Sequence, residues 1–199
     1  MMAASAAFPQ YKVGPAGPPP SDLPAAISGM LQKDGAKIMG PSGSAYCEIW
    51  FRSTAPSGPK STEDAVALPT IPVGALVGAL RWPAAGSDRR GQTIKPGLYT
   101  LRYAQHPVNG DHQGVAPQRD FFLMVPAAED KDPNSTPGFN DVVAMSRKAS
   151  GTPHPAVLSA SSSSNTTFPE IKKEGDSDWA LQAKLGDLPI SLILVGRAE

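Results

Sequence analysis

The three histidines of the chain are the side chains best suited to bind a metal ion. His106 and His112 lie in one segment rich in turn-forming residues, and His154 lies between two prolines in another. Three imidazoles that converge and leave one position open are a common zinc or copper site. Asp111 or Asp120 could complete the set of ligands or orient a ring from outside it. The alternative is three separate histidines satisfied by backbone groups or solvent, since spacing across two loops is unspecific.

A second group of oxygen-bearing side chains lies just before a predicted helix. Positions 1, 3, 5 and 12 of this stretch are Asp130, Asp132, Asn134 and Asp141, which is the spacing that wraps oxygen ligands around calcium. Ser135 stands where the sharp turn of such loops requires glycine, and the final aspartate is shorter than the usual glutamate. A solvated acidic loop that caps the helix accounts for the same residues, so calcium binding and helix capping remain alternatives.

Two tryptophans offer a different kind of binding surface. Trp50 lies two residues from Glu48 and from Arg52, so all three share one face of the predicted strand. Because the other two are charged, we expect the indole of Trp50 on the exposed face. Trp82 precedes Pro83 at the end of another strand. Aromatic rings stack on the flat faces of sugars, so the two indoles could bind a saccharide. The alternative is that both belong to the hydrophobic core.

Sequence motifs that carry enzymatic chemistry are missing from the chain. It contains no His-Glu-x-x-His, Cys-x-x-Cys, phosphate-binding Gly-x-x-x-x-Gly-Lys-Ser/Thr or dinucleotide-binding Gly-x-Gly-x-x-Gly pattern, and no Gly-x-Ser-x-Gly nucleophile elbow. The single cysteine, Cys47, lies in an apolar strand pattern, where we expect a buried and inert thiol. The sequence therefore favours a non-catalytic protein over an enzyme.

The composition excludes two classes of interaction. Lysine plus arginine and aspartate plus glutamate number 18 each among 199 residues, so the chain has no net charge with which to attract nucleic acid. No apolar run approaches the roughly 18 residues that a membrane-spanning helix needs. Glycine and proline are abundant, at 19 and 22 residues, and they accumulate in the turns between short strands. The composition favours a mostly β protein.

Hydrophobic periodicity locates the expected elements. Alternation predicts strands at residues 46–52, 98–104 and 179–185, and continuous apolar runs predict strands at residues 73–82, 120–125 and 190–195. Residues 155–161 carry a weaker strand signal. One helix is expected from Phe139 to Gly151, and a shorter one within residues 23–31. Residues 1–22 are expected to form a Pro/Gly-rich extension, and residues 23–199 a single domain. The expected fold is an antiparallel β-sandwich, immunoglobulin-like or jelly-roll-like, with one short inserted helix.

Part of the chain resembles a known group of proteins. The strand entry at residues 94–101 reads IKPGLYTL, and it is followed by residues 102–125 and, further on, 145–151. These segments are similar to exported bacterial β-sandwich proteins of unknown function. The resemblance implies the sandwich fold and export to the periplasm or the cell exterior, and it implies no chemistry.

From these observations we expect an exported, non-catalytic binding or structural module of the cell envelope. The sequence does not identify its ligand, for which an envelope component or a saccharide is a candidate. Two alternatives stay open. One is a metal-binding protein that holds zinc or copper, or less readily calcium, and the other is a carbohydrate-binding domain.

Overall fold

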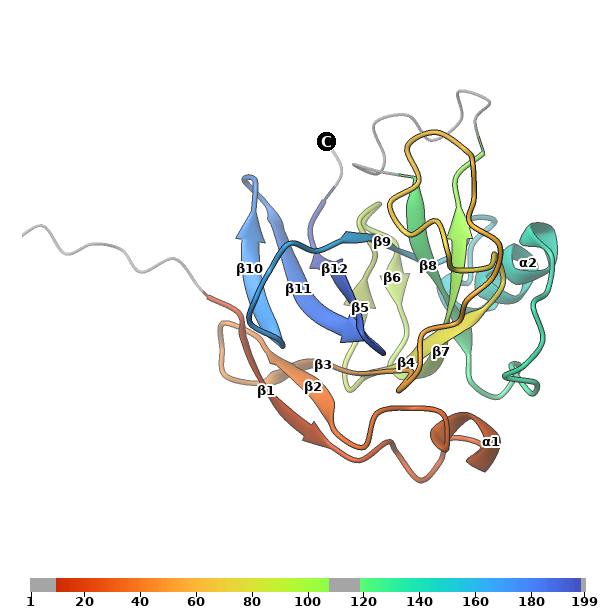
Figure 1. The fold of residues 1–199 in the computed structure, drawn as a ribbon. Coiled ribbons are helices and arrows are strands. Elements are labelled where there is room, and N and C mark those ends of the chain that lie inside the picture. The colour runs from red at the N-terminus through yellow and green to blue at the C-terminus, as the bar shows by residue number, and fades with distance from the viewer. Residues whose placement is uncertain (1–9, 108–118, 198–199) are drawn as a thin grey trace, which may run out of the picture.

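The computed structural model describes residues 10–107 and 119–197, and most of this chain is β structure (Figure 1). Ten strands form one sheet: β1 (Lys12–Gly17), β2 (Gly35–Met39), β3 (Ala45–Phe51), β4 (Leu76–Trp82), β7 (Gly97–Gln105), β8 (Asp120–Pro126), β9 (Val157–Ser162), β10 (Glu170–Glu174), β11 (Asp178–Leu185) and β12 (Leu188–Val195). The short strands β5 (Gly86–Ser87) and β6 (Thr93–Ile94) pair with each other. The helices are α1 (Ala25–Ser28) and α2 (Phe139–Ser150).

The ten strands follow one another across the sheet in the order β1-β2-β3-β4-β7-β8-β9-β12-β11-β10, and each neighbouring pair is antiparallel. The prediction of a mostly antiparallel β protein is confirmed. The sheet is continuous and curls until it is nearly closed into a barrel (Figure 1). The two separate stacked sheets of the sandwich prediction are therefore not distinct, because hydrogen-bonded ladders join all ten strands.

The inside of the curled sheet holds the main hydrophobic core. In β3, Cys47, Ile49 and Phe51 belong to this core, as the alternating pattern predicts. Burial raises the pKa of the Cys47 thiol, with a smaller contribution from the nearby carboxylate of Glu48, so the thiol stays protonated and unreactive. The side chain of Trp82 and apolar side chains from the other strands fill the rest of this core.

The outside of the sheet is covered in two places, so several strands are buried on both faces. Near α1, the side chains of Leu23, Ile27 and Leu31 pack on Trp50 and Leu76. This segment includes the short helix expected within residues 23–31, so the domain has one helix more than the single inserted one of the fold prediction. Neither helix is long and apolar enough to cross a membrane, and the described part of the chain holds no other candidate.

On the other side, α2 lies mainly against β8, with smaller contacts to β6 and β7, and Val142 packs on Phe121 and Leu123. The predicted bounds of this helix are confirmed. It ends at Gly151, whose φ of 66° is left-handed and whose N–H donates to the carbonyl of Arg147 at 2.9 Å. Glycine adopts that conformation without steric cost, which is why the helix stops there.

The N-terminal Pro/Gly-rich segment is part of the sheet. Residues 12–17, which we expected in an extension, form β1 and pair with β2, with Val13 opposite Ile38 and Pro15 opposite Ala36. The strand lies at the end of the sheet, where a proline without an N–H donor is tolerated. The segment therefore supplies one of the two free sheet edges.

The free edges of β1 and β10 face each other, and we call the line between them the seam. Some Cα atoms of the two strands lie within 8 Å, but among the described residues no ladder joins them. Near one end of the seam, the ring of Tyr11 contacts Trp179 with 5.4 Å between ring centroids. Near the other end, Nε2 of Gln32 donates to the carbonyl of Lys184 at 2.8 Å. Side-chain contacts bridge the seam at these two places.

Candidate functional site

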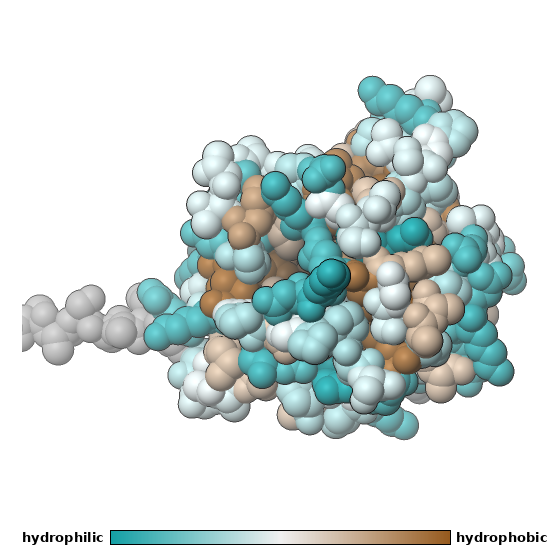
Figure 2. All heavy atoms as spheres, turned by 60° about the horizontal axis from the view of Figure 1, so that its bottom comes forward, coloured by the Kyte–Doolittle hydropathy of each residue, from teal (hydrophilic) through white to brown (hydrophobic). Residues whose placement is uncertain are grey.

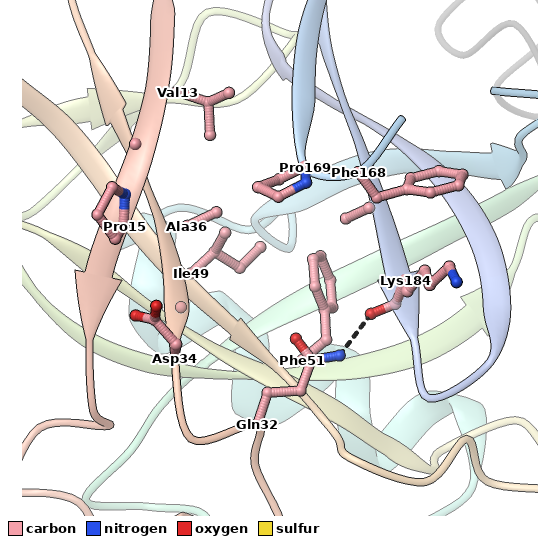
Figure 3. Close-up of a pocket in the computed structure, with 13 residues that line it drawn as sticks. Val13, Pro15, Gln32, Asp34, Ala36, Ile49, Phe51, Phe168, Pro169 and Lys184 are labelled. Carbon is pink, nitrogen blue, oxygen red and sulfur yellow. Dashed lines mark hydrogen bonds between the residues drawn. The ribbon is translucent and has the colours of Figure 1, made fainter. Parts of the chain in front are cut away.

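A groove of about 570 Å³ lies along the seam (Figure 3). We call it the seam groove. Its lining residues share an origin in the two ends of the sheet and the loops beside them: Val13, Gly14, Pro15, Gln32, Asp34, Gly35, Ala36, Ile49, Phe51, Phe168, Pro169, Ala183 and Lys184. Because the sheet does not close here, the groove runs between its two ends, and the buried side chains that face the interior of the curl form its base.

The floor of the seam groove is apolar and comes from three strands. Ala36 of β2 lies opposite Ile49 of β3 in the antiparallel register, and both belong to the hydrophobic core. Phe51 follows two residues later on the same face of β3. Ala183 of β11 completes the floor from the other side of the seam. The regular alternation of β3 thus sets the apolar surface that a ligand would meet.

The walls of the seam groove come from segments far apart in the chain. Val13 and Pro15 of β1 form one wall, and Phe168 and Pro169, just before β10, form the other (Figure 3). On the face shown in Figure 2, apolar surface gathers beside the point where the described chain begins, and hydrophilic residues surround it. The seam groove therefore offers apolar contact on its floor and on both walls.

One end of the seam groove carries its polar groups. Oδ1 of Asp34 accepts a hydrogen bond from the backbone N–H of Gly17 at 2.7 Å, which holds the carboxylate at the rim. Gln32 makes the bond across the seam to the carbonyl of Lys184. The ammonium of Lys184 lies 5.7 Å from the ring centroid of Phe168 and points away from the groove (Figure 3). The polar groups left facing the groove are therefore hydrogen-bond acceptors.

The chemistry of this lining is that of a binding site. Ligand pockets in proteins measure about 300–1,000 Å³ and combine apolar walls with a few placed polar groups, a description that the seam groove fits. Among its described lining residues no histidine, cysteine, serine or tyrosine occurs, and the ionisable side chains there are those of Asp34 and Lys184.

The histidines of the proposed metal site lie in different surroundings. His106 directly follows β7, where its N–H donates to the carbonyl of Arg119 and its ring stacks on Phe121 at 4.2 Å. His154 is exposed in the loop after α2, and its carbonyl accepts from the hydroxyl of Ser150 at 2.5 Å.

Strand register separates the two rings. His106 lies beside Arg119, just before β8. The chain near His154 lies beside Met124 instead, because the carbonyl of Ala156 accepts from the N–H of Met124. Arg119 and Met124 are five residues apart, which is about 17 Å in an extended strand. His112 and Asp111 lie outside the described residues. Among the described residues, no group of three or more His, Cys, Asp or Glu side chains could hold a metal ion. The zinc or copper site stays a prediction, to which His106 and His154 do not contribute together.

The acidic loop of the proposed calcium site surrounds a cation that the protein itself supplies. The side chain of Asp130 is 2% exposed, and its two oxygens accept from Nε and Nη2 of Arg102 at 2.7 and 2.6 Å. The hydroxyl of Thr100 donates to the same carboxylate at 2.6 Å. The Asp130 carboxylate is therefore fully engaged by a buried guanidinium.

Backbone carbonyls take the remaining donors of this guanidinium. Nη1 of Arg102 donates to the carbonyls of Gly74 and Ser135 at 2.6 and 2.8 Å, and Nη2 donates to that of Asp132 at 2.8 Å. All five N–H groups of the arginine thus have acceptors. The oxygens of the loop therefore surround the guanidinium of Arg102 in β7, and calcium binding stays a prediction.

The other residues of the proposed calcium site have local roles. Oδ1 of Asp132 accepts from the N–H of Asn134 at 3.0 Å, which closes a turn. Asp141 lies in the first turn of α2, where a carboxylate favours the positive end of the helix dipole. The N-cap residue of α2 is Gly138, and no side chain caps it, so of the helix-capping alternative only the favourable charge of Asp141 in the first turn is present.

The two tryptophans proposed to stack on sugar are both buried, with 2% exposure for Trp50 and 1% for Trp82. Trp50 does point to the outer face of β3, but the chain around α1 covers it, and its Nε1 donates to the carbonyl of Gly17 at 2.8 Å. Nε1 of Trp82 donates to the sulfur of Met124 at 3.4 Å. The expectation of an exposed Trp50 was wrong, because alternation reveals the face of a strand but not what covers it.

Asp120, proposed to complete the metal ligands or to orient a histidine, makes its contacts in another part of the fold. Its buried carboxylate accepts from the hydroxyl of Tyr103 at 2.6 Å and from the backbone N–H groups of Ala67 and Leu68 at 2.7 and 2.9 Å. Burial and the hydrogen bond to this carboxylate raise the pKa of Tyr103. The Asp120 carboxylate therefore anchors the long connection between β3 and β4 to the sheet.

No protein-family model, no curated protein and no solved structure matches the chain. The seam groove is therefore the basis for inferring a function. Sequence reasoning did not find the groove. Its residues come from segments far apart in the chain, since the bond between Gln32 and Lys184 alone joins positions 152 apart, and none of these segments carries a recognisable motif.

Proposed function

We propose that the protein is a non-catalytic binding module whose ligand occupies the seam groove. The observation that supports this most is the apolar volume of about 570 Å³ that stays open between the two ends of the sheet. The floor residues are almost sealed, with 1% exposure for Ile49 and 3% for Phe51, so the apolar surface that a ligand would bury comes mainly from the walls. Val13 and Phe168 of the walls are partly exposed, and burial of such apolar surface by a ligand is favourable.

The cell envelope is the place of action that we propose. This part of the proposal rests on the resemblance of residues 94–125 to exported bacterial β-sandwich proteins, and it adds nothing to the identity of the ligand. The seam groove favours an apolar or amphipathic molecule over a free saccharide, because its described lining offers few polar groups and no exposed tryptophan.

The experiment is a titration of the protein with the neutral, environment-sensitive dye N-phenyl-1-naphthylamine. Ala36→Leu and Ala183→Leu each place a larger side chain in the groove from opposite sides of the seam. Ala144→Leu makes the same change on an exposed position of α2 and serves as the matched control. We expect the wild type and the control to enhance the dye's fluorescence, and each filled variant to weaken binding about tenfold or more through steric exclusion.

Circular dichroism and thermal unfolding of all three variants show whether they are folded. Equal dye binding by folded Ala36→Leu, folded Ala183→Leu and the wild type would mean that the groove is not the ligand site. Loss of binding in the Ala144→Leu control would also contradict the proposal, because this position lies on α2, away from the seam.

A further inference from the structure

The polar end of the seam groove indicates which head group a ligand carries. Building on the proposed function, we infer that the ligand is a small amphiphile with an apolar body and a positively charged amine, and that Asp34 binds the amine.

The first step concerns the direction of Gln32. The carbonyl of Lys184 can only accept a hydrogen bond, so the group of Gln32 that lies 2.8 Å from it must be the amide NH₂. That contact turns Oε1 of the same side chain toward the groove (Figure 3). Gln32 therefore presents an acceptor to a bound molecule, while its donor holds the seam together.

The second step concerns Asp34. The N–H of Gly17 donates to Oδ1 and fixes the carboxylate, while Oδ2 has no partner among the described residues. No ion pair within the described chain neutralises this carboxylate. An acidic group held at the rim of an apolar groove favours a cation that brings N–H donors.

The third step concerns Lys184, the other charged residue of the lining. Its ammonium packs over the ring of Phe168 at 5.7 Å and points away from the groove (Figure 3). An anionic head group at the polar end would meet Asp34 and Oε1 of Gln32, both of which repel it. A primary ammonium satisfies both acceptors, and an alcohol satisfies one.

The size and the closure of the groove point to a small molecule. The contact between Tyr11 and Trp179 crosses the seam near β1's start, and the bond from Gln32 to Lys184 crosses it near the polar end. An extended polypeptide would have to pass both crossings, whereas a molecule with a short alkyl chain fits between them within about 570 Å³. The ligand class is therefore a hydrophobic primary amine.

The test uses three probes with the same apolar chain, n-octylamine, 1-octanol and octanoate, in isothermal titration calorimetry at pH 7. We expect octylamine to bind about two- to fivefold more tightly than octanol, the preference that one exposed ion pair provides, and octanoate to bind more weakly than octanol. Asp34→Asn keeps the acceptor for Gly17 and removes the charge. It should make octylamine and octanol equal while leaving octanol binding unchanged.

Asp176→Asn, an exposed acid in the turn between β10 and β11, is the matched control and should keep the preference for octylamine. If octanoate binds most tightly, or if Asp34→Asn retains the full amine preference, the inference is overturned while groove binding by the apolar chain stands. If none of the three probes binds to the wild type, the proposed function itself fails.

Discussion

Removal of the Asp130 carboxylate is expected to destabilise the protein more than any change on the surface. Asp130→Ala leaves Nε and one N–H of Nη2 of Arg102 without acceptors, in a side chain that is 0% exposed. The carbonyls of Gly74, Asp132 and Ser135 still hold the guanidinium in place, so the unpaired charge cannot turn to solvent.

The expected magnitude follows from the burial of both partners. Breaking a buried ion pair by deleting one member costs about 3–5 kcal/mol, because the other charge stays desolvated. A domain has only about 5–15 kcal/mol of stability in total. With a urea dependence of about 2 kcal/mol/M, the unfolding midpoint of Asp130→Ala should fall by about 1.5–2.5 M.

The assay is urea unfolding at pH 7, followed by tryptophan fluorescence. Arg102→Met in the Asp130→Ala background should cost less than the sum of the single changes by about 2 kcal/mol or more, because it removes the unpaired charge. A midpoint shift below about 0.5 M for Asp130→Ala would refute the reasoning, since at about 2 kcal/mol/M it corresponds to the value of a surface pair. A rise of the wild-type midpoint with added calcium would instead favour the calcium hypothesis.

Three further predictions concern the scaffold. Gly35→Ala should lower the free energy of unfolding by about 1–3 kcal/mol in urea titrations, because its added Cβ would lie 2.7 Å from the Ile49 carbonyl; Gly14→Ala, with nothing within 4 Å, is the matched control, and equal losses would contradict this. Ala65 has a φ of 59°, so Ala65→Gly should raise the thermal midpoint with a gain of about 0.5–1 kcal/mol, and a lower midpoint would count against it. Burial raises the pKa of Asp88, and this effect exceeds the opposing effect of the hydrogen bonds from Gln92. The protonated carboxyl group therefore stabilises the folded state at low pH, and this stabilisation is lost as the pH rises through the folded pKa. Wild-type stability relative to Asp88→Asn should therefore rise from pH 7 toward pH 4 in urea titrations, by an amount that the pKa shift sets, and a falling difference would show the opposite sign.

Local patterns predicted the elements that bury one face or end at a clear signal. The alternation of β3 placed Cys47, Ile49 and Phe51 on one side, and all three lie in the core. The 3.6-residue period and Gly151 located α2 because a left-handed glycine ends a helix wherever it occurs. These features depend on neighbours in the chain, which a sequence displays directly.

Five strands were not predicted, namely β1, β2, β5, β6 and β10. Two of them, β1 and β10, are the edge strands of the large sheet. β1 contains Gly14, Pro15 and Gly17, a composition typical of loops, and it is a strand only because β2 pairs with it. β10 reads EIKKE, in which charged residues dominate. Charge and proline at sheet edges discourage pairing with other chains, and the same residues weaken the strand signal.

The global closure and the seam groove could not be predicted for a different reason. Alternation shows which side chains share a face, but not whether ten strands form two sheets or one curled sheet. Trp50 looked exposed because the segment that covers it begins more than 20 positions earlier in the sequence. In the same way, the spacing of the acidic loop predicted a site for a cation but not that Arg102 contacts it. This arginine lies 28 residues before Asp130 in the sequence.

The most direct test of the account is the mapping of amide chemical shifts during a titration of ¹⁵N-labelled protein with n-octylamine. The account predicts that the amides that shift cluster along the seam, at Gly14, Gly35, Phe51 and Ala183, and that those of α2 stay in place. Saturable shifts centred on α2 or on the loop around His154, with the seam amides unmoved, would contradict it.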